Sequence, residues 1–327
     1  NNQANKEALW KHRWVADAGG HGSSNGNWKL NRMDEDFQCV LSQFGAWEKT
    51  QEAVLSYEYD AEGYFMPTQH LLNLFVQDDG TLDPRYHASF TTQWNGNKAF
   101  TWDASTQANF NKDASVVGQS LAVGEMAYKI VVPQDADYAT EVANKATSKY
   151  LLVDYKDVYD DANHNVKMTL NGKDNLFRYI YPSLSKHKSS NYYVANASKM
   201  RNGNLNATFI MRMAEIYLIA AEADLYLNGG SGAMTYINKV RSRAGAKPLT
   251  GTPTIRTILD ERGRELCGEY CRFYDLKRTG MLKNASYLNE THPDLGQYFK
   301  PEYALRPIPQ AYIQAISNGD SYQNPGY

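Results

Sequence analysis

The sequence predicts a mainly α-helical protein in which the regular helices lie in residues 206–327. From about residue 206 onward, apolar side chains recur with the period of an α-helix. Residues 1–205 instead carry short apolar runs interrupted by turn signals such as GGHGSSNGN and DDGTLDP, which favour irregular loops with a few helices and short strands. The chain has 327 residues, of which 42% are hydrophobic, so it can bury a large core. We expect the two regions to form one integrated domain.

Net charge and cysteine content exclude several classes of function. The formal net charge is −2 at pH 7, so the chain lacks the basic character typical of nucleic-acid-binding proteins. Three cysteines cannot form a disulfide framework, and we expect Cys267 and Cys271, four residues apart on a predicted helix, to be buried on one face. No run of 18 apolar residues is present, so the sequence predicts no membrane-spanning helix.

Two elements are predicted in the loop-rich region. Residues 52–60, EAVLSYEYD, alternate in the manner of a β-strand. Residues 66–76 predict a helix, because Leu71, Leu74 and Phe75 fall on one face.

Three helices are predicted in the second region. The first, within residues 209–230, is apolar on most faces and ends at a Gly-Gly pair that suits a helix C-terminus. The second covers residues 231–245. The third runs from about Thr254 within residues 252–270, and Thr252, followed by Pro253, suits its N-terminus. Helix, short turn and helix, with small alanines at the crossing points, form the unit of tetratricopeptide-type packing.

The charged stretch ERGRELCGEYCRFYDLKRTG, residues 261–280, has a catalytic and a structural interpretation. Glu261 and Glu265 resemble in type the two carboxyls that flank a glycosidic bond in glycoside hydrolases. However, they lie on consecutive turns of one helix and point the same way, and the neighbouring arginines favour their ionised forms. We therefore favour a structural role, in which paired charges fix this helix to its neighbours, and we expect no catalytic residue.

Several motifs resemble those of one known family. MRMAEIYLIAAEA (211–223), INKVRSRAGA (237–246), ILDERGRELCGEYCRFYDLKRTG (258–280) and PIPQAYIQAISNGDSYQNPGY (307–327) look like the C-terminal signatures of the SusD/RagB family, in the same order. MPTQHLLNLFVQDDGTLDPRY (66–86) resembles an upstream segment of that family, although its DDGTLDPR differs somewhat from the usual spelling.

This resemblance implies a SusD-like, tetratricopeptide-type helical scaffold with long irregular loops. It also implies a non-enzymatic lipoprotein on the outer-membrane surface of a Gram-negative bacterium. Members of the family bind oligosaccharides, or in some cases peptides, and deliver these nutrients to a SusC-like TonB-dependent transporter. Full-length members carry a lipid-anchored cysteine and a long N-terminal helical part; only residues 1–51 precede the strand-like segment here, so we expect both to be absent from this chain.

Candidate ligand-binding residues come from aromatic side chains in polar loops, because sugars offer C–H faces to aromatic rings and hydroxyls to amides and carboxylates. In QWNGNKAFTWD (93–103), Trp94 and Trp102 bracket Asn95 and Asp103. The alternative is that both tryptophans pack beneath the loop. Weaker candidates of the same kind are Tyr64, Trp28, Tyr192 and Tyr193.

The sequence indicates no cofactor and no catalytic metal. The motif DVYDDANHN places Asp161, Asn163 and Asn165 at alternate positions, as at the start of a calcium-binding EF-hand loop. The sixth and twelfth positions of such a loop are Val166 and Gly172 in place of the usual Gly and Glu, so a solvated loop is the favoured interpretation.

Three functions remain open from the residues alone. Capture of glycans or peptides for a transporter is the favoured one. The alternatives are a glycoside hydrolase on an all-α scaffold, which needs two carboxyls on separate elements with a raised pKa, and a scaffold that docks peptides. Turnover of a glycan would separate the hydrolase from the other two.

Overall fold

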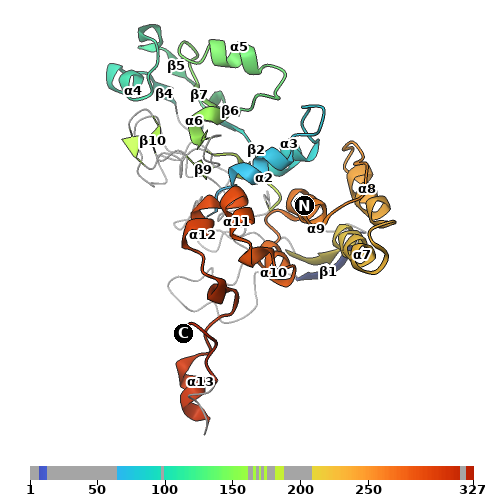
Figure 1. Ribbon diagram of the computed structural model, residues 1–327. Helices are drawn as coiled ribbons and strands as arrows, with labels where there is room; N and C mark the ends of the chain where they lie inside the picture. Colours follow the sequence, from blue (N-terminus) through green and yellow to red (C-terminus); the bar gives the residue numbers. More distant parts are fainter. Residues whose placement is uncertain are drawn as a thin grey trace.

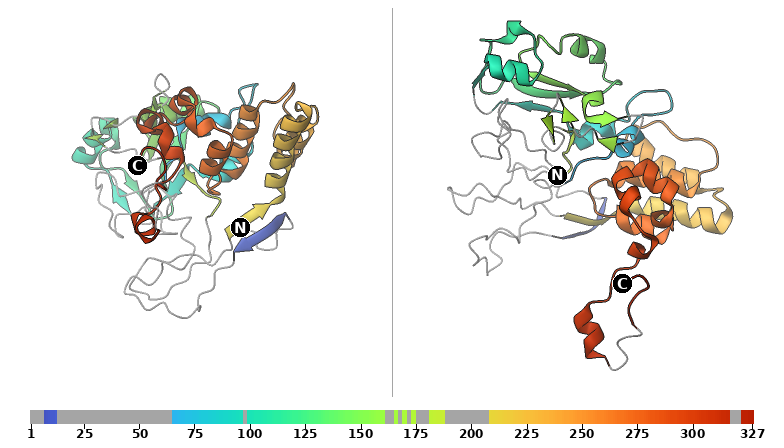
Figure 2. Two further views of the ribbon diagram at one scale, coloured as in Figure 1. Left: turned by 60° about the horizontal axis from the view of Figure 1, so that its bottom comes forward. Right: turned by 60° about the vertical axis from the view of Figure 1, so that its left-hand side comes forward.

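The structure, a computed structural model, describes residues 7–12, 65–96, 99–160, 165–166, 169–170, 173–174, 181–187, 208–316 and 322–327. Figure 1 shows two parts within these ranges: the short strands within residues 90–184 and the helices within residues 213–298. The segment 69–89 lies between them. In Figure 1 and in the right-hand view of Figure 2, α13 lies away from both parts.

The predicted mainly α-helical fold with a few short strands is confirmed. The helices are α2 (Gln69–Leu74), α3 (Arg85–Ser89), α4 (Ala104–Asn109), α5 (Tyr138–Ala143), α6 (Tyr155–Val158), α7 (Met213–Asn228), α8 (Ala233–Arg243), α9 (Ile255–Leu266), α10 (Arg272–Arg278), α11 (Ala285–Thr291), α12 (Pro293–Tyr298) and α13 (Gln310–Ala315). The strands are β1 (Ala8–His12), β2 (Phe90–Thr91), β3 (Gln93–Asn95), β4 (Phe100–Thr101), β5 (Ser120–Leu121), β6 (Met126–Val131), β7 (Leu151–Asp154), β8 (Tyr159–Asp160), β9 (Asn165–Val166), β10 (Thr169–Leu170), β11 (Lys173–Asp174), β12 (Ser183–Leu184) and β13 (Thr208–Arg212).

A three-stranded sheet forms the centre of the strand-bearing part. Its strand order is β3-β6-β7, with β3 antiparallel and β7 parallel to β6. The connection from β6 to β7 contains α5, as a parallel pair requires a crossover between its strands. The other strands pair two by two: β1 with β13, β2 with β12, β4 with β5, β8 with β9, and β10 with β11.

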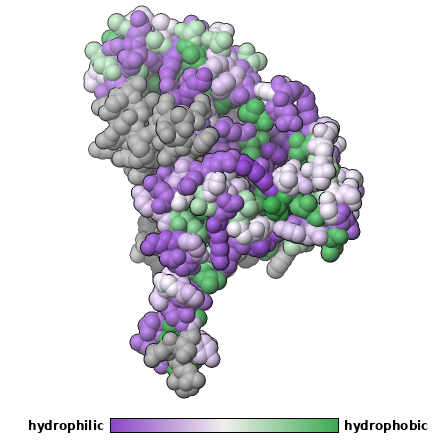
Figure 3. Space-filling view, in the orientation of Figure 1, coloured by the Kyte–Doolittle hydropathy of each residue, from purple (hydrophilic) through white to green (hydrophobic). Residues whose placement is uncertain are grey.

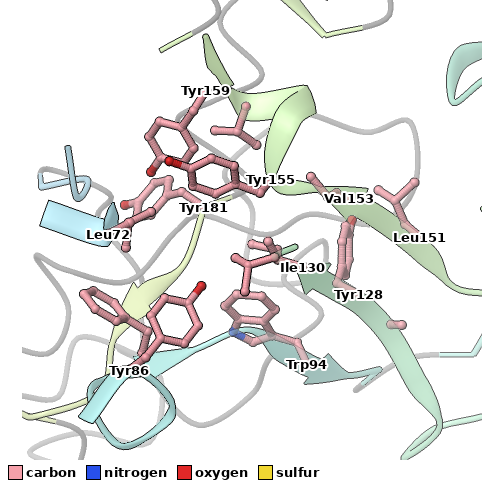
Figure 4. Packing of buried hydrophobic residues seen from close by; sticks show 14 of the residues in the cluster. Leu72, Tyr86, Trp94, Tyr128, Ile130, Leu151, Val153, Tyr155, Tyr159 and Tyr181 are labelled. Atoms are coloured by element: carbon pink, nitrogen blue, oxygen red, sulfur yellow. The ribbon is translucent and has the colours of Figure 1, made fainter. Parts of the chain in front are cut away.

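Buried aromatic side chains fill the core beside this sheet (Figure 4). The rings of Tyr155 and Tyr159 stack with their centroids 4.9 Å apart. Both hydroxyls have partners: Tyr159 Oη donates to the Pro67 carbonyl at 2.9 Å, and Tyr155 Oη donates to Asn73 Oδ1 at 2.9 Å. Several of the chain's 24 tyrosines therefore pack the core, where a buried hydroxyl needs a partner.

The predicted helix at residues 66–76 is confirmed as the shorter α2. Thr68 caps its N-terminus, since Thr68 Oγ1 accepts a hydrogen bond from the Leu71 N–H at 3.1 Å. Leu72 and Phe75 are buried against the aromatic core, and Leu74 lies toward α9. The strand predicted at residues 52–60 lies outside the described residues.

The apolar segment at residues 209–230 begins as a strand and continues as a helix. Thr208–Arg212 pairs antiparallel with β1, and α7 starts only at Met213. The helix ends at Gly229, whose φ of 64° is left-handed, as its Gly-Gly signal predicts. α7 packs against α8 and α9, in the predicted manner of helix, short turn and helix.

α9 is shorter than the sequence suggests, and this corrects the expectation for the two cysteines. Its N-terminal cap is Thr254, which agrees with the predicted start, but it already ends at Leu266. Gly268 then has a φ of 76°, which is left-handed, and breaks the helical path. Cys267 and Cys271 consequently lie on either side of a turn and do not share a helix face.

The surface over α7, which packs beside α8, carries exposed apolar side chains. On α7, Ile219, Tyr226 and Leu227 are exposed, so this helix is packed on fewer sides than its sequence suggests. Figure 3 shows hydrophobic side chains on the side of the molecule where these two helices lie. In the described part of the chain, every helix is too short or too polar to cross a lipid bilayer.

The turn after α9 gives a test of the fold. We expect Gly268→Ala to lower the free energy of unfolding by about 1–2 kcal/mol through its left-handed backbone. A further ~1–3 kcal/mol comes from overpacking, because the new methyl group would overlap the buried Leu184 side chain. Gly118→Ala is the control, since Gly118 has a φ of 86° but no neighbouring atom within 4 Å. Urea unfolding measures both variants, and an equal loss of unfolding free energy in the two would contradict the close contact between Gly268 and Leu184.

Candidate functional site

The two tryptophans predicted to form a sugar platform are buried. Trp94 is 4% exposed and Trp102 is 1% exposed. Trp94 lies in the aromatic core (Figure 4), and Trp102 Nε1 donates to the Lys149 carbonyl at 2.8 Å. Neither ring offers a face to a ligand, so the alternative, packing beneath the loop, describes them better. The physical reason is that burying a large aromatic ring removes much apolar surface from water.

Of the other predicted site residues, two are exposed and four lie outside the described residues. Asn95 and Asp103 are exposed. Asp103 caps α4, because its Oδ1 accepts a hydrogen bond from the Thr106 N–H at 2.7 Å, and this bond lowers the pKa of its carboxyl group. Contact of these two residues with a ligand stays a prediction. Tyr64, Trp28, Tyr192 and Tyr193 lie outside the described residues.

Glu261 in the charged stretch is fully buried among three arginines. Its Oε1 accepts a hydrogen bond from Arg85 Nη1 at 2.8 Å, and its Oε2 accepts from Arg241 Nη1 at 3.0 Å and from Arg264 Nε at 2.8 Å. Burial alone would raise the pKa of Glu261, but the charges of Arg264, Arg85 and Arg241 hold it below its ordinary value. This carboxylate stays ionised, whereas an acid catalyst needs a raised pKa.

Glu265 and Glu269 continue the same network. Glu265 accepts from Arg85 Nη1 at 3.0 Å, from Arg212 Nη1 at 2.5 Å and from Arg243 Nη2 at 2.6 Å. Burial opposes ionisation of Glu269, but Lys186 and Arg212 lower the pKa of its carboxyl to about 2. These contacts support the structural interpretation of the charged stretch.

A half-open pocket of about 330 Å³ lies where α2, the end of α9 and the start of α10 meet. Its walls are largely apolar. They include Met66, Leu71, Leu74, Phe90, Leu184 and Leu266. This volume is at the lower end of the range found for small-molecule sites, so the pocket suits one end of a larger ligand.

Two aromatic rings form the exposed edge of this pocket. Phe65 is 46% exposed and Tyr270 is 51% exposed, and both line the pocket. The rings meet edge to face, with centroids 6.3 Å apart and an angle of 79° between their planes. Unlike the buried tryptophans, these rings are accessible to a ligand.

The backbone at Tyr270 is strained. Its φ is 58°, in the left-handed region that a residue with a side chain rarely adopts. Such a conformation costs about 1–2 kcal/mol relative to the ordinary regions, so the fold must hold it in place. Strain of this kind is concentrated at functional sites, and here it places an aromatic ring at the pocket edge.

The polar groups of the pocket are arginines and histidines. Arg262 is 4% exposed and donates from Nε to Asp275 Oδ2 at 2.6 Å. Arg272 is half-buried and donates to the Leu259 carbonyl at 2.6 Å. Burial, together with Arg272, lowers the pKa of His292 to about 4, so this imidazole is neutral at pH 7.

The two cysteines of the pocket are not activated nucleophiles, and its aspartate is held by arginines. Burial raises the pKa of the Cys271 thiol to about 11 and also raises that of Cys267, so neither is a thiolate at neutral pH. Asp275 has both oxygens occupied, by Arg262 and Arg278. Across the described ranges, no three histidine, cysteine or acidic side chains gather in a way that could hold a metal ion. Asp161 and Asn163 of the calcium-like motif lie outside those ranges.

Comparison with known proteins identifies the family. A model described as the SusD family matches residues 6–327. The chain belongs to the SusD family. Two curated SusD-like proteins from Formosa agariphila are 38% identical over 128 residues and 32% identical over 150 residues. These matches cover 36% and 42% of this chain but only 24% and 29% of the relatives.

A solved structure shares the fold. A SusD-like protein from Bacteroides fragilis superposes with a TM-score of 0.53 and 19% sequence identity. The match covers 100% of this SusD-family chain and 55% of the other protein. The chain therefore spans about half the length of this solved relative.

Sequence reasoning missed both aromatic residues at the pocket edge. In EGYFMP the sequence favours Tyr64, whereas the structure describes its neighbour Phe65 at the pocket. Tyr270 lies inside the charged stretch, where the density of charges dominates the interpretation. One signal is available, because Gly268 two residues earlier indicates that the helix ends before Tyr270.

The buried glutamate gives a stability test. We expect Glu261→Gln to lower the free energy of unfolding by about 3–5 kcal/mol, because three buried arginine contacts lose their counter-charge. Glu290→Gln is the matched control and should cost at most about 1 kcal/mol, since Glu290 pairs with Arg256 at the surface. Urea unfolding measures both, and similar losses would show that the buried network is not a main source of stability.

Glu269 gives a pH test. The pKa of its carboxyl is about 2 in the folded protein, whereas the ordinary value of 4.5 applies to the unfolded chain. A lowered folded pKa contributes stability above the unfolded value and loses it as the pH falls through the folded value. We therefore expect the free energy of unfolding to fall between pH 4.5 and 2, with a shallower slope in Glu269→Gln. Identical slopes, measured by urea unfolding at several pH values, would contradict this assignment.

Proposed function

We propose that this SusD-family protein captures oligosaccharides at the surface of the outer membrane without cleaving them. The captured ligand is delivered to a SusC-like TonB-dependent transporter, and a lipid anchor holds the protein at the membrane. Family membership supports this role, because the family resemblance implies surface capture of nutrients. The observation that carries the proposal to particular residues is the accessible Phe65–Tyr270 pair at the edge of an apolar pocket.

The chemistry of the pocket suits a sugar. One face of a pyranose ring presents C–H groups that pack on an aromatic ring, and its hydroxyls need polar partners. Phe65 and Tyr270 supply the rings, and Arg262 and Arg272 supply hydrogen-bond donors. The pocket takes one end of the oligosaccharide, and the rest of the chain extends over the surface.

Capture without cleavage agrees with the ionisation of the nearby acids. Glycoside hydrolysis needs a protonated carboxyl group as general acid. Glu261 and Glu269 have lowered pKa values, and Asp275 accepts hydrogen bonds from arginines on both oxygens. Glu261 and Glu269 therefore serve the scaffold and are unsuited to act as a general acid.

A ring deletion at the pocket tests this proposal. Tyr270→Asn removes the ring while keeping a residue that tolerates a left-handed backbone, so folding should be preserved. Tyr298→Asn is the control, because Tyr298 is 74% exposed and does not line the pocket. We expect glycan affinity to fall about 3- to 10-fold in Tyr270→Asn and to be unchanged in the control, as stacking contributes about 0.5–1.5 kcal/mol.

The measurement is calorimetry of the intact protein against a glycan panel, with a peptide mixture alongside and an assay for new reducing ends. A glycan that binds without release of reducing ends supports capture. If peptides bind and no glycan does, the ligand of this protein is a peptide and the proposed ligand class is wrong. Release of reducing ends would show a hydrolase and overturn the proposal.

A further inference from the structure

Arg262 brings an unsatisfied hydrogen-bond donor to the pocket. Its Nε donates to Asp275 and its Nη2 donates to Glu215 Oε1 at 3.3 Å. Its Nη1 is buried and has no hydrogen-bond partner in the described part of the chain. A buried N–H group without an acceptor is unfavourable, and nearly all such groups in folded proteins have a partner. An acceptor that enters the pocket would supply the missing bond.

Arg272 is also incompletely paired. It donates from Nη1 to the Leu259 carbonyl and from Nη2 to Tyr287 Oη, at 2.6 and 2.7 Å. A guanidinium has five N–H donors, so three are left without an acceptor among the described residues. Both of its acceptors are neutral, and no carboxylate within the described ranges forms an ion pair with it.

Two nearby arginines, in contrast, form ion pairs with carboxylates. Arg278 pairs with Glu222 and Asp275, and Arg256 pairs with Glu290. Asp275 is the one acidic side chain among the described residues that line the pocket, and Arg262 and Arg278 already occupy its two oxygens. Arg272 therefore lines a largely apolar pocket without an ion pair to any described carboxylate, beside a neutral His292.

We propose that this pocket recognises an acidic group on the captured glycan, either a carboxylate of a uronic acid or a sulfate ester. The anionic oxygens accept hydrogen bonds from Arg272 and from Arg262 Nη1, while the sugar ring packs on Phe65 and Tyr270. Planar guanidinium groups match such oxygens with two parallel hydrogen bonds, and low-polarity walls strengthen the attraction. This inference rests on the proposed function for the sugar part of the ligand.

The test compares sugars that differ only in the acidic group. The intact protein is titrated by calorimetry with methyl glucoside, methyl glucuronide, and methyl glucoside carrying a 6-sulfate, together with 3-phenylpropionate as an acid without a sugar. We expect at least one acidic sugar to bind about tenfold or more tightly than the neutral sugar, because hydrogen bonds to charged groups are the strong ones. The acid that binds better tells a carboxylate from a sulfate as the natural group.

Two matched variants assign the preference to a residue. Arg272→Gln removes the unpaired charge, and we expect the tenfold preference to disappear. Arg256→Gln makes the same chemical change outside the pocket, on an arginine whose guanidinium packs over the ring of the same Tyr287. This control should keep the preference. Should Arg272→Gln fail to fold, the comparison of ligands on the unmodified protein still decides the question.

Each outcome has a distinct meaning. Equal affinity for neutral and acidic sugars overturns the inference and leaves glycan capture intact. Binding of 3-phenylpropionate alone shows that the pocket takes acids but not sugars, so the proposed function fails at this site while anion recognition stands. A preference that survives in Arg272→Gln overturns the role of Arg272.

Discussion

A buried network of arginines and glutamates fixes the relative positions of the elements around the end of α9. Asp83 and Arg85 precede and begin α3, Arg212 ends β13, and Arg241 belongs to α8. The three arginines have the glutamates of α9 as their common partners, and Asp83 pairs with Arg85. No single neighbouring element could satisfy these glutamates alone. Removing charges from water is costly, so a buried network is stable only when every member has its partners in good geometry. The elements must therefore come together in one arrangement.

This constraint extends to the pocket. Glu265 lies one residue before the end of α9, and Glu269 lies in the turn that follows it. Because Arg212 and Lys186 hold Glu269, the turn has little freedom, and the next residue, Tyr270, adopts its left-handed backbone. The network thus stabilises the strain that places the aromatic ring at the pocket edge. Glu265 and Glu269, which have a structural role, thus help to position Tyr270, the proposed binding residue in the same charged stretch.

Much of the fold follows from sequence periodicity, and most of the candidate site does not. The period of 3.6 residues identifies α7, α8 and α9, since each has an apolar face that a neighbour covers. The same signal extends across Thr208–Arg212, where pairing with β1 overrides it. Trp94 and Trp102 show the limit for loops: an aromatic residue among polar neighbours has the same local pattern whether its ring is buried or accessible.

Tyr270 shows a second limit. Its role depends on the left-handed backbone of its own turn and on Phe65, which is distant in sequence. The pairing of Arg262 and the incomplete pairing of Arg272 are likewise properties of the assembled structure, because they depend on which acids lie within reach. The sequence shows that the stretch contains many acidic and basic residues, but it does not show which of them has no oppositely charged partner in the folded protein.

The distinction between binding and catalysis also follows from pairing. A proton donor needs a carboxyl group that is neutral near pH 7, and burial beside apolar groups is the usual way to obtain one. Here burial is accompanied by guanidinium groups, which reverse its effect on Glu261 and Glu269. The arginines that keep these two carboxyls ionised are hydrogen-bonded to them, whereas Arg272 has no ion pair with a described carboxylate. This difference in pairing is the physical ground on which we propose recognition of an acidic ligand at the charged stretch.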